Sequence, residues 1–211
     1  MWEQVRQFHE RINEFMIESP EGINLIGYSQ GGMIARGVIE TSPSHNIKNF
    51  ISLSSPQAGY HGGKLFVPKS HFSVGNEEKY SVSVSGLWKD PRDIVRYKKE
   101  GRFLACLNND YPHRLNQQFK TTMCRLERLV LIGGPDDGIV VPWQSAHFDF
   151  DDSYGNIVEM RNQEFYKNDR FCLRTLDERG AIVKHVVPGV QHGNWYTSPS
   201  IIQNYIIPYL T

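Results

Sequence analysis

Residues 27–31 of the sequence read Gly-Tyr-Ser-Gln-Gly and place a serine between two glycines in the G-x-S-x-G pattern. This pattern is typical of the nucleophile elbow of serine hydrolases, in which the serine occupies a sharp turn between a strand and a helix. The glycines at 27 and 31 remove β-carbons where strand and helix approach each other. Because the first amides of the helix point into the space above Ser29, the backbone N–H of Gln30 is a candidate oxyanion donor.

The residues on either side of the motif favour an elbow over a chance match. The sequence has 18 glycines in 211 residues, so the pattern can also arise by chance. The alternative interpretation is a plain turn whose serine has no catalytic role. Residues 22–26 form an apolar strand pattern before the motif, and residues 30–40 form a helical pattern that Thr41-Ser42-Pro43 ends. This context predicts Ser29 as a nucleophile.

A serine nucleophile needs a base within hydrogen-bond reach, and His192 is the candidate among the eight histidines. It follows the predicted last strand, residues 181–187, with glycines nearby. We interpret His185, which lies inside that strand, as structural, and His9 lies on the first predicted helix. The sequence shows no partner for the remaining ones: His45, His61, His71, His113 and His147.

The candidate acids are Asp136 and Asp137, which follow the unbroken apolar run at residues 129–132 on a turn bracketed by glycines. Ligand chemistry in α/β sheets gathers beyond the carboxyl ends of strands, so either aspartate could orient a histidine. A β-turn that uses Pro135-Asp136 for turn chemistry is the alternative, and spacing does not choose between the aspartates. The order Ser…Asp…His is that of α/β-hydrolases.

The elements that must position these residues alternate between helix and strand. Apolar residues at steps of three and four predict a first helix over residues 2–16. We expect strands at 22–26, 49–53, 129–132, 156–160 and 181–187, and helices at 30–40, 173–179 and 198–209. The strand–helix–strand order predicts a mostly parallel sheet flanked by helices, an α/β-hydrolase architecture in a single domain over residues 1–211.

Residues 57–123 interrupt this alternation with glycine-punctuated, aromatic pieces, and we expect an inserted cap there with helices near 93–99 and 114–119. Its aromatic side chains could cover an apolar ligand, or they could form the cap's own small core. The residues in question are Phe66, Phe72, Tyr80, Trp88, Tyr97 and Phe103.

Composition excludes several classes of function. A formal net charge of zero and a pI of about 7.1 indicate no nucleic-acid partner. No apolar run reaches the roughly 18 residues of a membrane span, and no signal-peptide pattern follows Met1. The three cysteines lack a C-x-x-C spacing, so we expect neither a disulfide scaffold nor a zinc site, and they suggest a reducing compartment.

Several stretches together resemble the palmitoyl-protein thioesterases, and the type-2 lysosomal branch is the most similar. The resemblance runs through residues 26–32, 50–57, 131–145, 179–183 and 207–210. It implies Ser29 as nucleophile, Asp137 as acid, His192 as base and the Gln30 amide as oxyanion donor, with no metal and no cofactor. It also implies a lysosomal location.

The activity implied by the resemblance is hydrolysis of long-chain fatty acyl thioesters, either S-acylated cysteine or acyl-CoA. The same side chains serve oxygen-ester lipases and esterases, and a third hypothesis is a weakly active remnant that binds acyl chains or a partner. Only 28 residues precede Ser29, so we expect the family's early strands to lie outside this sequence and residues 1–211 alone to be poorly soluble and nearly inactive.

Overall fold

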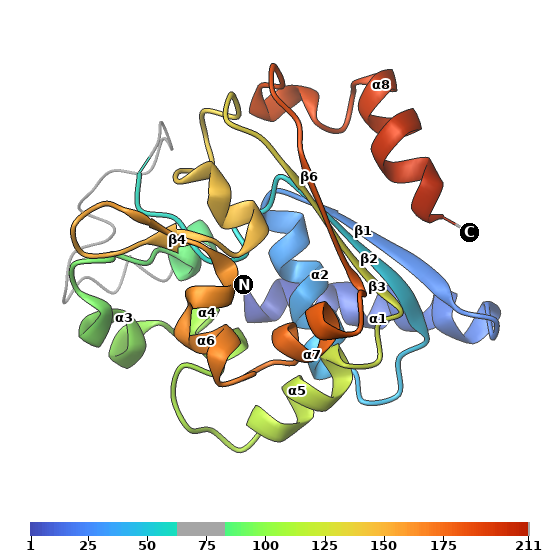
Figure 1. The fold of residues 1–211 in the computed structure, drawn as a ribbon. Helices are drawn as coiled ribbons and strands as arrows, with labels where there is room; N and C mark the ends of the chain where they lie inside the picture. Colours follow the sequence, from blue (N-terminus) through green and yellow to red (C-terminus); the bar gives the residue numbers. More distant parts are fainter. Residues whose placement is uncertain (63–82, 211) are drawn as a thin grey trace.

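The centre of the protein is a four-stranded sheet with the order β1-β2-β3-β6, in which all neighbouring strands are parallel (Figure 1). The computed structural model describes residues 1–62 and 83–210. The strands are β1 (Ile23–Tyr28), β2 (Ile47–Leu53), β3 (Arg128–Gly133) and β6 (Ile182–Val186). Since helices cover the sheet, the prediction of a mostly parallel sheet flanked by helices is confirmed.

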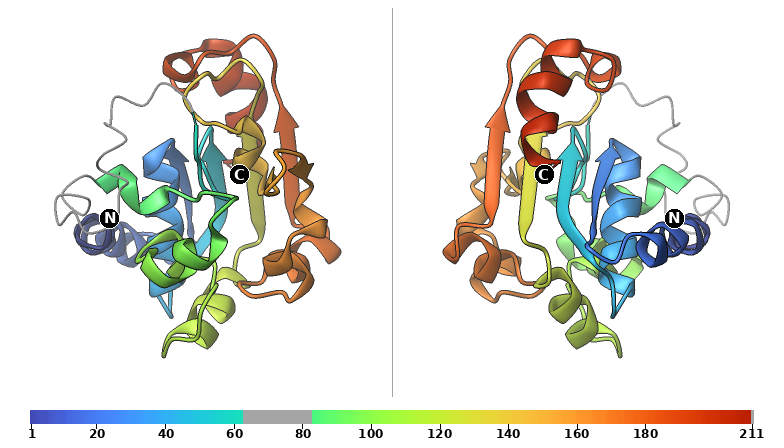
Figure 2. Two further views of the ribbon diagram at one scale, coloured as in Figure 1. Left: turned by 90° about the vertical axis from the view of Figure 1, so that its left-hand side faces the viewer. Right: turned by 90° about the vertical axis from the view of Figure 1, so that its right-hand side faces the viewer.

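Helices lie on both sides of the sheet, as the two views of Figure 2 show. Helix α2 (Gln30–Thr41) lies on one side, with α1 (Trp2–Glu18) packed against it beyond the β1 edge, and the C-terminal segment that begins with α8 (Pro199–Ile201) lies on the other side. β2 and β3 bury alternate residues on the two sides. On the α2 side the cluster includes Phe50, Leu129, Leu131, Ala35 and Ile39. On the α8 side it includes Ile51, Val130, Ile132, Trp195 and Ile201.

Parallel pairing brings the carboxyl ends of the strands to one edge of the sheet, where ligands bind in open α/β folds. Ser29 follows β1, Ser54 follows β2, Asp137 lies in the loop after β3, and His192 lies in the loop after β6. The fold therefore gathers residues that are far apart in the sequence at a single edge.

The described part of the region between β2 and β3 contains short helical elements joined by turns and isolated bridges. It contains a 3₁₀ turn (Ser83–Leu87), α3 (Ile94–Glu100), α4 (Leu104–Leu107) and α5 (Asn116–Met123). Tyr97 and Phe103 are buried, and Trp88 is partly buried, in a cluster with α1 and α2 residues. These three aromatic side chains are thus core residues, whereas Phe66, Phe72, Tyr80 and His71 lie outside the described residues.

The region between β3 and β6 contains short elements. These are 3₁₀ turns (Trp143–His147 and Met160–Asn162), β4 (Phe150–Asp151), β5 (Ile157–Val158), α6 (Glu164–Lys167) and α7 (Leu173–Glu178). The strand expected at 156–160 is shorter and pairs antiparallel with β4 outside the main sheet. After α8 the predicted closing helix continues as a π turn (Ile202–Ile206) and a 3₁₀ turn (Ile207–Tyr209).

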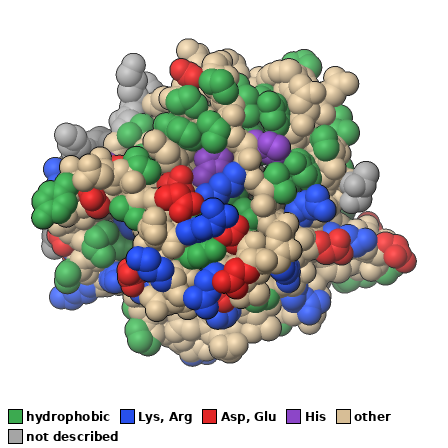
Figure 3. Space-filling model, viewed as in Figure 1, with side chains coloured by type: hydrophobic (Ala, Val, Ile, Leu, Met, Phe, Trp, Pro, Cys, Tyr) green, Lys and Arg blue, Asp and Glu red, His purple; other side chains and the backbone are tan. Residues whose placement is uncertain are grey.

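The surface shows no large area of one charge on the face drawn in Figure 3, where Lys and Arg side chains are interspersed with Asp and Glu. This agrees with the formal net charge of zero. Within residues 1–62 and 83–210, none of the helices combines the length and apolar character that crossing a membrane requires.

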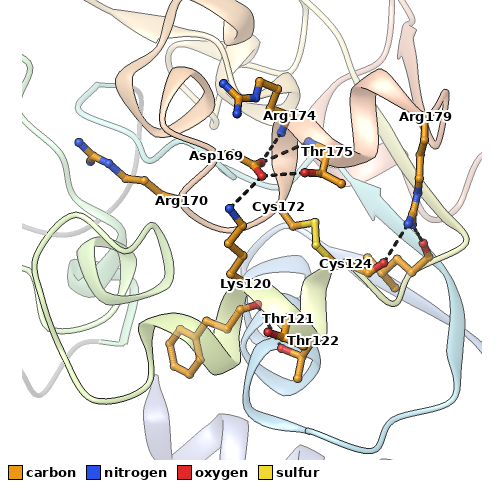
Figure 4. Close-up of a disulfide and its surroundings, with 12 residues drawn as sticks. Lys120, Thr121, Thr122, Cys124, Asp169, Arg170, Cys172, Arg174, Thr175 and Arg179 are labelled. Atoms are coloured by element: carbon orange, nitrogen blue, oxygen red, sulfur yellow. Dashed lines mark hydrogen bonds and ion pairs between the residues drawn. A yellow bond between two sulfur atoms is a disulfide. The ribbon is translucent and has the colours of Figure 1, made fainter.

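Cys124 and Cys172 form a disulfide, which the spacing of the three cysteines did not predict (Figure 4). Their Cα atoms are 5.4 Å apart although 48 residues separate them in the sequence. An ion pair joins the same two segments, because Lys120 Nζ lies 3.0 Å from the Asp169 carboxylate. Arg179 adds a hydrogen bond of 3.0 Å to the Cys124 carbonyl. The junction fastens the end of α5 to the start of α7.

Replacing both disulfide cysteines by alanine is expected to lower the free energy of unfolding by about 4 kcal/mol, the loop-closure value for a 48-residue loop. Chemical denaturation of the purified protein measures this loss. Cys106→Ala is the matched control because Cys106 is a free cysteine, and it should leave the midpoint close to that of the wild type. An unchanged midpoint in the double variant would show that the crosslink adds nothing to stability.

Candidate active site

Ser29 occupies the turn between β1 and α2 in a backbone conformation that is rare for a residue other than glycine. Its φ is 52° and its ψ is −126°, and its N–H donates a 2.9 Å hydrogen bond to the Leu53 carbonyl on β2. Such backbone strain persists where the surrounding structure over-determines it, and it is concentrated at functional sites. The turn leaves the Ser29 side chain partly exposed at the carboxyl edge of the sheet.

The close approach of strand and helix at this turn is made by Gly27 and Gly32. A β-carbon on Gly27 would lie 2.7 Å from Gly32 N and 2.8 Å from Gly31 O. A β-carbon on Gly32 would lie 2.6 Å from the Ser55 side chain, whereas one on Gly31 would meet nothing within 4 Å. The expectation that Gly31 is needed for this approach is therefore wrong, because the helix turns that residue outward.

Gly27→Ala is expected to disrupt the elbow, because the new β-carbon would collide with backbone atoms of α2 that cannot rotate away. We expect a loss of activity of at least about 100-fold and a lower melting temperature, since a misplacement of about 1 Å at a reacting group can cost that much. Gly31→Ala is the matched control and should keep both properties. Equal effects of the two substitutions would contradict this account of the turn.

Ser29, His192 and Asp137 form a continuous chain of hydrogen bonds. His192 Nε2 lies 2.9 Å from Ser29 Oγ. On the other side of the ring, Nδ1 lies 2.9 Å from Asp137 Oδ1 and 2.8 Å from Oδ2. The structure thus brings together the three side chains that the sequence singled out, from the loops after β1, β3 and β6. A hydroxyl, an imidazole and a carboxylate in this order can perform nucleophilic acyl transfer.

The Asp137 carboxylate is buried and surrounded by donors. Oδ1 accepts the backbone N–H groups of Ile139 at 3.1 Å and Val140 at 2.8 Å. Oδ2 accepts the Ser54 hydroxyl and, at 2.7 Å, the Trp195 indole N–H. Burial by itself would raise the pKa of Asp137, but the hydrogen bonds from His192, Ser54 and Val140 outweigh it and lower the pKa. Asp137 therefore stays ionised in mildly acidic solution.

Tyr28, the residue before the nucleophile, holds His192 from another side. Its hydroxyl donates a 2.7 Å hydrogen bond to the His192 carbonyl, and the two rings lie 5.1 Å apart. The backbone N–H of His192 donates a 3.0 Å hydrogen bond to the backbone carbonyl of Asp137. Burial, followed by the charge of Asp137 and the proximity of Tyr196, raises the pKa of Tyr28 to about 12, so the phenol keeps its proton.

Asp136 and Asp137 have different environments, although the sequence does not distinguish them by spacing. Asp136 is exposed, and its Oδ2 accepts the Gly189 N–H at 2.7 Å, so it fastens one loop to the other. Close packing also brings these loops together, because a β-carbon on Gly134 would lie 2.8 Å from the carbonyl carbon of Val187. Only Asp137 of the pair contacts the imidazole of His192 in the described structure.

The other described histidines lie away from this site, and several have partners that the sequence did not reveal. His185 packs against Tyr209, whose hydroxyl lies 2.7 Å from Nε2, which agrees with a structural role. The remaining pairs are His45 with the Thr122 carbonyl, His61 with Asp151, His113 with Cys106 and His147 with the His185 carbonyl. His45, His61 and His147 thus contact segments that are far away in the sequence, whereas Cys106 lies only 7 residues before His113.

Gln30 is the first residue of α2, so its backbone N–H lies at the positive end of the helix beside Ser29. The Gln30 side chain points toward α1, with Nε2 3.3 Å from Gln4 Oε1. Within the described residues, no group of three or more His, Cys, Asp or Glu side chains is placed to hold a metal ion. Sequence reasoning missed Tyr28, Ser54 and Trp195, whose contacts depend on the folded loops.

Comparison with known proteins identifies the family. A family model described as palmitoyl protein thioesterase matches residues 1–192. The chain belongs to the palmitoyl protein thioesterase family. It is 40% identical over 221 residues to the lysosomal thioesterase PPT2-B of Xenopus laevis, covering 100% of this chain and 77% of the relative. It is 38% identical over 220 residues to the lysosomal thioesterase PPT2 of Homo sapiens, and this match covers 100% of this chain and 73% of the relative. These relatives assign it to the type-2 branch, as the resemblance predicted.

Among solved structures, a monoacylglycerol lipase of Paleococcus ferrophilus is similar to this chain with a TM-score of 0.43 and 14% sequence identity. The similarity covers 94% of this chain and 71% of the lipase. A lipase-esterase related protein of Clostridium acetobutylicum gives a TM-score of 0.40 at 17% identity, and the similarity covers 96% of this chain and 75% of that protein.

Proposed function

We propose that the protein hydrolyses long-chain fatty acyl thioesters, with Ser29 as nucleophile, His192 as general base and Asp137 as the acid that orients the imidazole. The observation that carries the proposal is the unbroken hydrogen-bond chain from Ser29 Oγ through His192 to Asp137. Membership of the palmitoyl protein thioesterase family supports a palmitoyl-like acyl group. The acyl donor is then an S-acylated cysteine or acyl-CoA.

The first half of the reaction acylates Ser29. His192 Nε2 takes the proton from Oγ as the oxygen attacks the thioester carbonyl, and Asp137 stabilises the imidazolium that forms. The negative charge on the carbonyl oxygen faces the start of α2, where the Gln30 N–H donates to it. Collapse of the tetrahedral intermediate breaks the carbon–sulfur bond, leaves the acyl group on Ser29 and releases a thiolate. The thiolate takes up the proton held by His192, which restores the neutral imidazole for the second half.

The second half of the reaction releases the fatty acid. Water, deprotonated by His192, attacks the Ser29 ester, and the proton on His192 returns to Ser29 Oγ.

The leaving group of the first half distinguishes thioesters from oxygen esters. A thiol with a reference pKa near 8.5 leaves readily as thiolate, so a thioester needs less acid assistance from His192 than an oxygen ester does. The same residues can cleave oxygen esters, with a larger requirement for proton donation.

The substrate class is tested by comparing palmitoyl-CoA with a palmitoyl oxygen ester of matched leaving-group size. We expect kcat/KM for the thioester to exceed that for the oxygen ester by at least about tenfold. A preference for the oxygen ester would identify a lipase or esterase instead. Absence of turnover on both, together with binding of the acyl chain, would identify a non-catalytic acyl-binding protein and overturn the proposal.

We extend the proposal to location and domain organisation. The Cys124–Cys172 disulfide is typical of proteins that fold in an oxidising compartment, and relatives carry the name lysosomal thioesterase. Both observations support a lysosomal location. Residues 57–123, inserted between β2 and β3, are proposed as a cap within the single domain 1–211. In support, Tyr97 and Phe103 anchor the described part of this insertion to α1 and α2.

A further inference from the structure

Two side chains outside the Ser29, His192 and Asp137 set converge on a single oxygen of the Asp137 carboxylate. The Ser54 hydroxyl and the Trp195 indole N–H both donate to Oδ2, the latter at 2.7 Å. The backbone N–H groups of Ile139 and Val140 are donors to the opposite oxygen, Oδ1. Each carboxylate oxygen thus accepts at least two hydrogen bonds besides those of His192.

The backbone of Ser54 is held in an unfavourable conformation that aims its hydroxyl at Asp137. Its φ is 44°, in the left-handed region that non-glycine residues rarely adopt. A 2.7 Å hydrogen bond from the Ser54 N–H to the Ile132 carbonyl on β3 fixes this turn. Strain of this kind also occurs at Ser29, so β1 and β2 both end in a strained serine at the same edge of the sheet.

Trp195 approaches Asp137 from the loop that carries His192. Its side chain is fully buried among residues of β2, β3 and α8, and its Nε1–H donates to the Asp137 carboxylate. A buried indole N–H needs an acceptor, and a buried carboxylate needs donors. Because Trp195 lies three residues after His192, the same short turn (His192–Asn194) delivers both the imidazole and the indole to Asp137.

We propose that Ser54 and Trp195 are positioning residues for Asp137, and that their two hydrogen bonds fix the plane of the carboxylate so that it receives His192 Nδ1–H. This rests on the proposed catalytic role of the three residues. With donors on both oxygens, the carboxylate cannot rotate about its Cβ–Cγ bond without breaking hydrogen bonds. Neither residue contacts the reacting atoms, and both act through Asp137.

The hydrogen bonds also set how strongly Asp137 attracts a proton on His192. Donors on the carboxylate draw off negative charge, so removing one leaves a more basic carboxylate that stabilises the imidazolium further. Within residues 1–62 and 83–210, the titratable groups that interact with Asp137 are His192, on the loop after β6, and Tyr28, at the end of β1. Because Tyr28 keeps its proton, a shift in the acidic limb of the kcat/KM profile reports on the Asp137–His192 pair.

The test uses Ser54→Ala, Ser54→Gly and Trp195→Phe in the purified protein with palmitoyl-CoA as substrate. Each is expected to lower kcat about tenfold, equivalent to about 1.4 kcal/mol, with KM within about twofold. The acidic limb of the kcat/KM profile should move to higher pH. Ser54→Gly separates the hydroxyl from backbone strain, because glycine accepts a φ of 44° without cost and should still be impaired.

Ser52→Ala is the matched control, because Ser52 is an equally buried serine on β2 whose hydroxyl contacts Gln57 at 2.9 Å. It should keep both kcat and the pH profile. The proposal is overturned if the folded Ser54 variants retain the wild-type kcat and acidic limb, or if Ser52→Ala is equally impaired. It is also overturned if Ser54→Gly recovers full activity. If Trp195→Phe fails to fold, the two Ser54 variants decide the outcome.

Proton NMR separates a failure of this proposal from a failure of the proposed function. The His192 Nδ1–H proton that bridges to Asp137 should give a low-field resonance, whether or not thioesters are substrates. A shift of this resonance in Ser54→Ala and Trp195→Phe, but not in Ser52→Ala, supports the positioning role even if palmitoyl-CoA is not hydrolysed. An unchanged resonance in both variants contradicts it even if the wild-type protein is active.

Discussion

Ser29→Ala is expected to abolish thioester hydrolysis, with a loss in kcat of about 10⁶, the size seen when a serine protease loses its nucleophile. The reason is that no other hydroxyl in the described residues contacts His192 Nε2. Turnover of palmitoyl-CoA and covalent labelling with a fluorophosphonate measure the loss. Labelling should vanish together with turnover, because both reactions require the Ser29 oxygen.

The control for this variant is its thermal stability. Ser29 is partly exposed, and serine and alanine experience similar strain at a φ of 52°, so the melting temperature should change little. Ser29→Gly provides a second inactive variant in which that strain is removed. If either variant keeps its fold and its fluorophosphonate labelling, the reactive serine lies elsewhere.

Asp137→Asn is expected to lower kcat by about 10⁴, the cost of the equivalent change in a serine protease. An amide has one accepting oxygen, so it cannot satisfy Val140, Trp195 and His192 as the carboxylate does. It therefore favours the wrong imidazole tautomer. The measurement is kcat at a pH where the wild type is fully active.

Asp136→Asn is the matched comparison, because it changes the neighbouring residue in the same way. Its amide oxygen can still accept the Gly189 N–H, and the side chain is exposed, so kcat should stay within a few-fold of the wild type. The reverse ranking of the two variants would rule out Asp137 as the orienting acid and would require Asp136 to move toward His192.

Features set by local sequence were predictable. The strand and helix on either side of Ser29 follow from the apolar runs and the Thr41-Ser42-Pro43 stop, and β1 and α2 lie where the pattern places them. Since parallel strands end at one edge, the loops that carry Ser29, Asp137 and His192 could be expected to meet. The choice of Asp137 over Asp136 depended on family resemblance, and in the structure Asp137 contacts His192.

Features set by contacts between distant segments were not predictable. The Cys124–Cys172 pair has no spacing signal, because its residues meet only after α5 and α7 pack together. The G-x-S-x-G pattern singles out Gly31, and only the direction of the first turn of α2 makes Gly32 the crowded one. Ser54 and Trp195 belong to no motif, and the folded loops alone aim them at Asp137.

During turnover, Ser29 should become acylated by the long-chain thioester. This acylation is tested most directly by acid-quenching the protein during turnover of palmitoyl-CoA and mapping the acylated peptide by mass spectrometry. We expect a palmitoyl ester on Ser29 that is absent from Ser29→Ala and accumulates when water attack is slowed in Asp137→Asn. An acyl group on another side chain, such as the free thiol of Cys106, with Ser29 unmodified, would contradict this expectation.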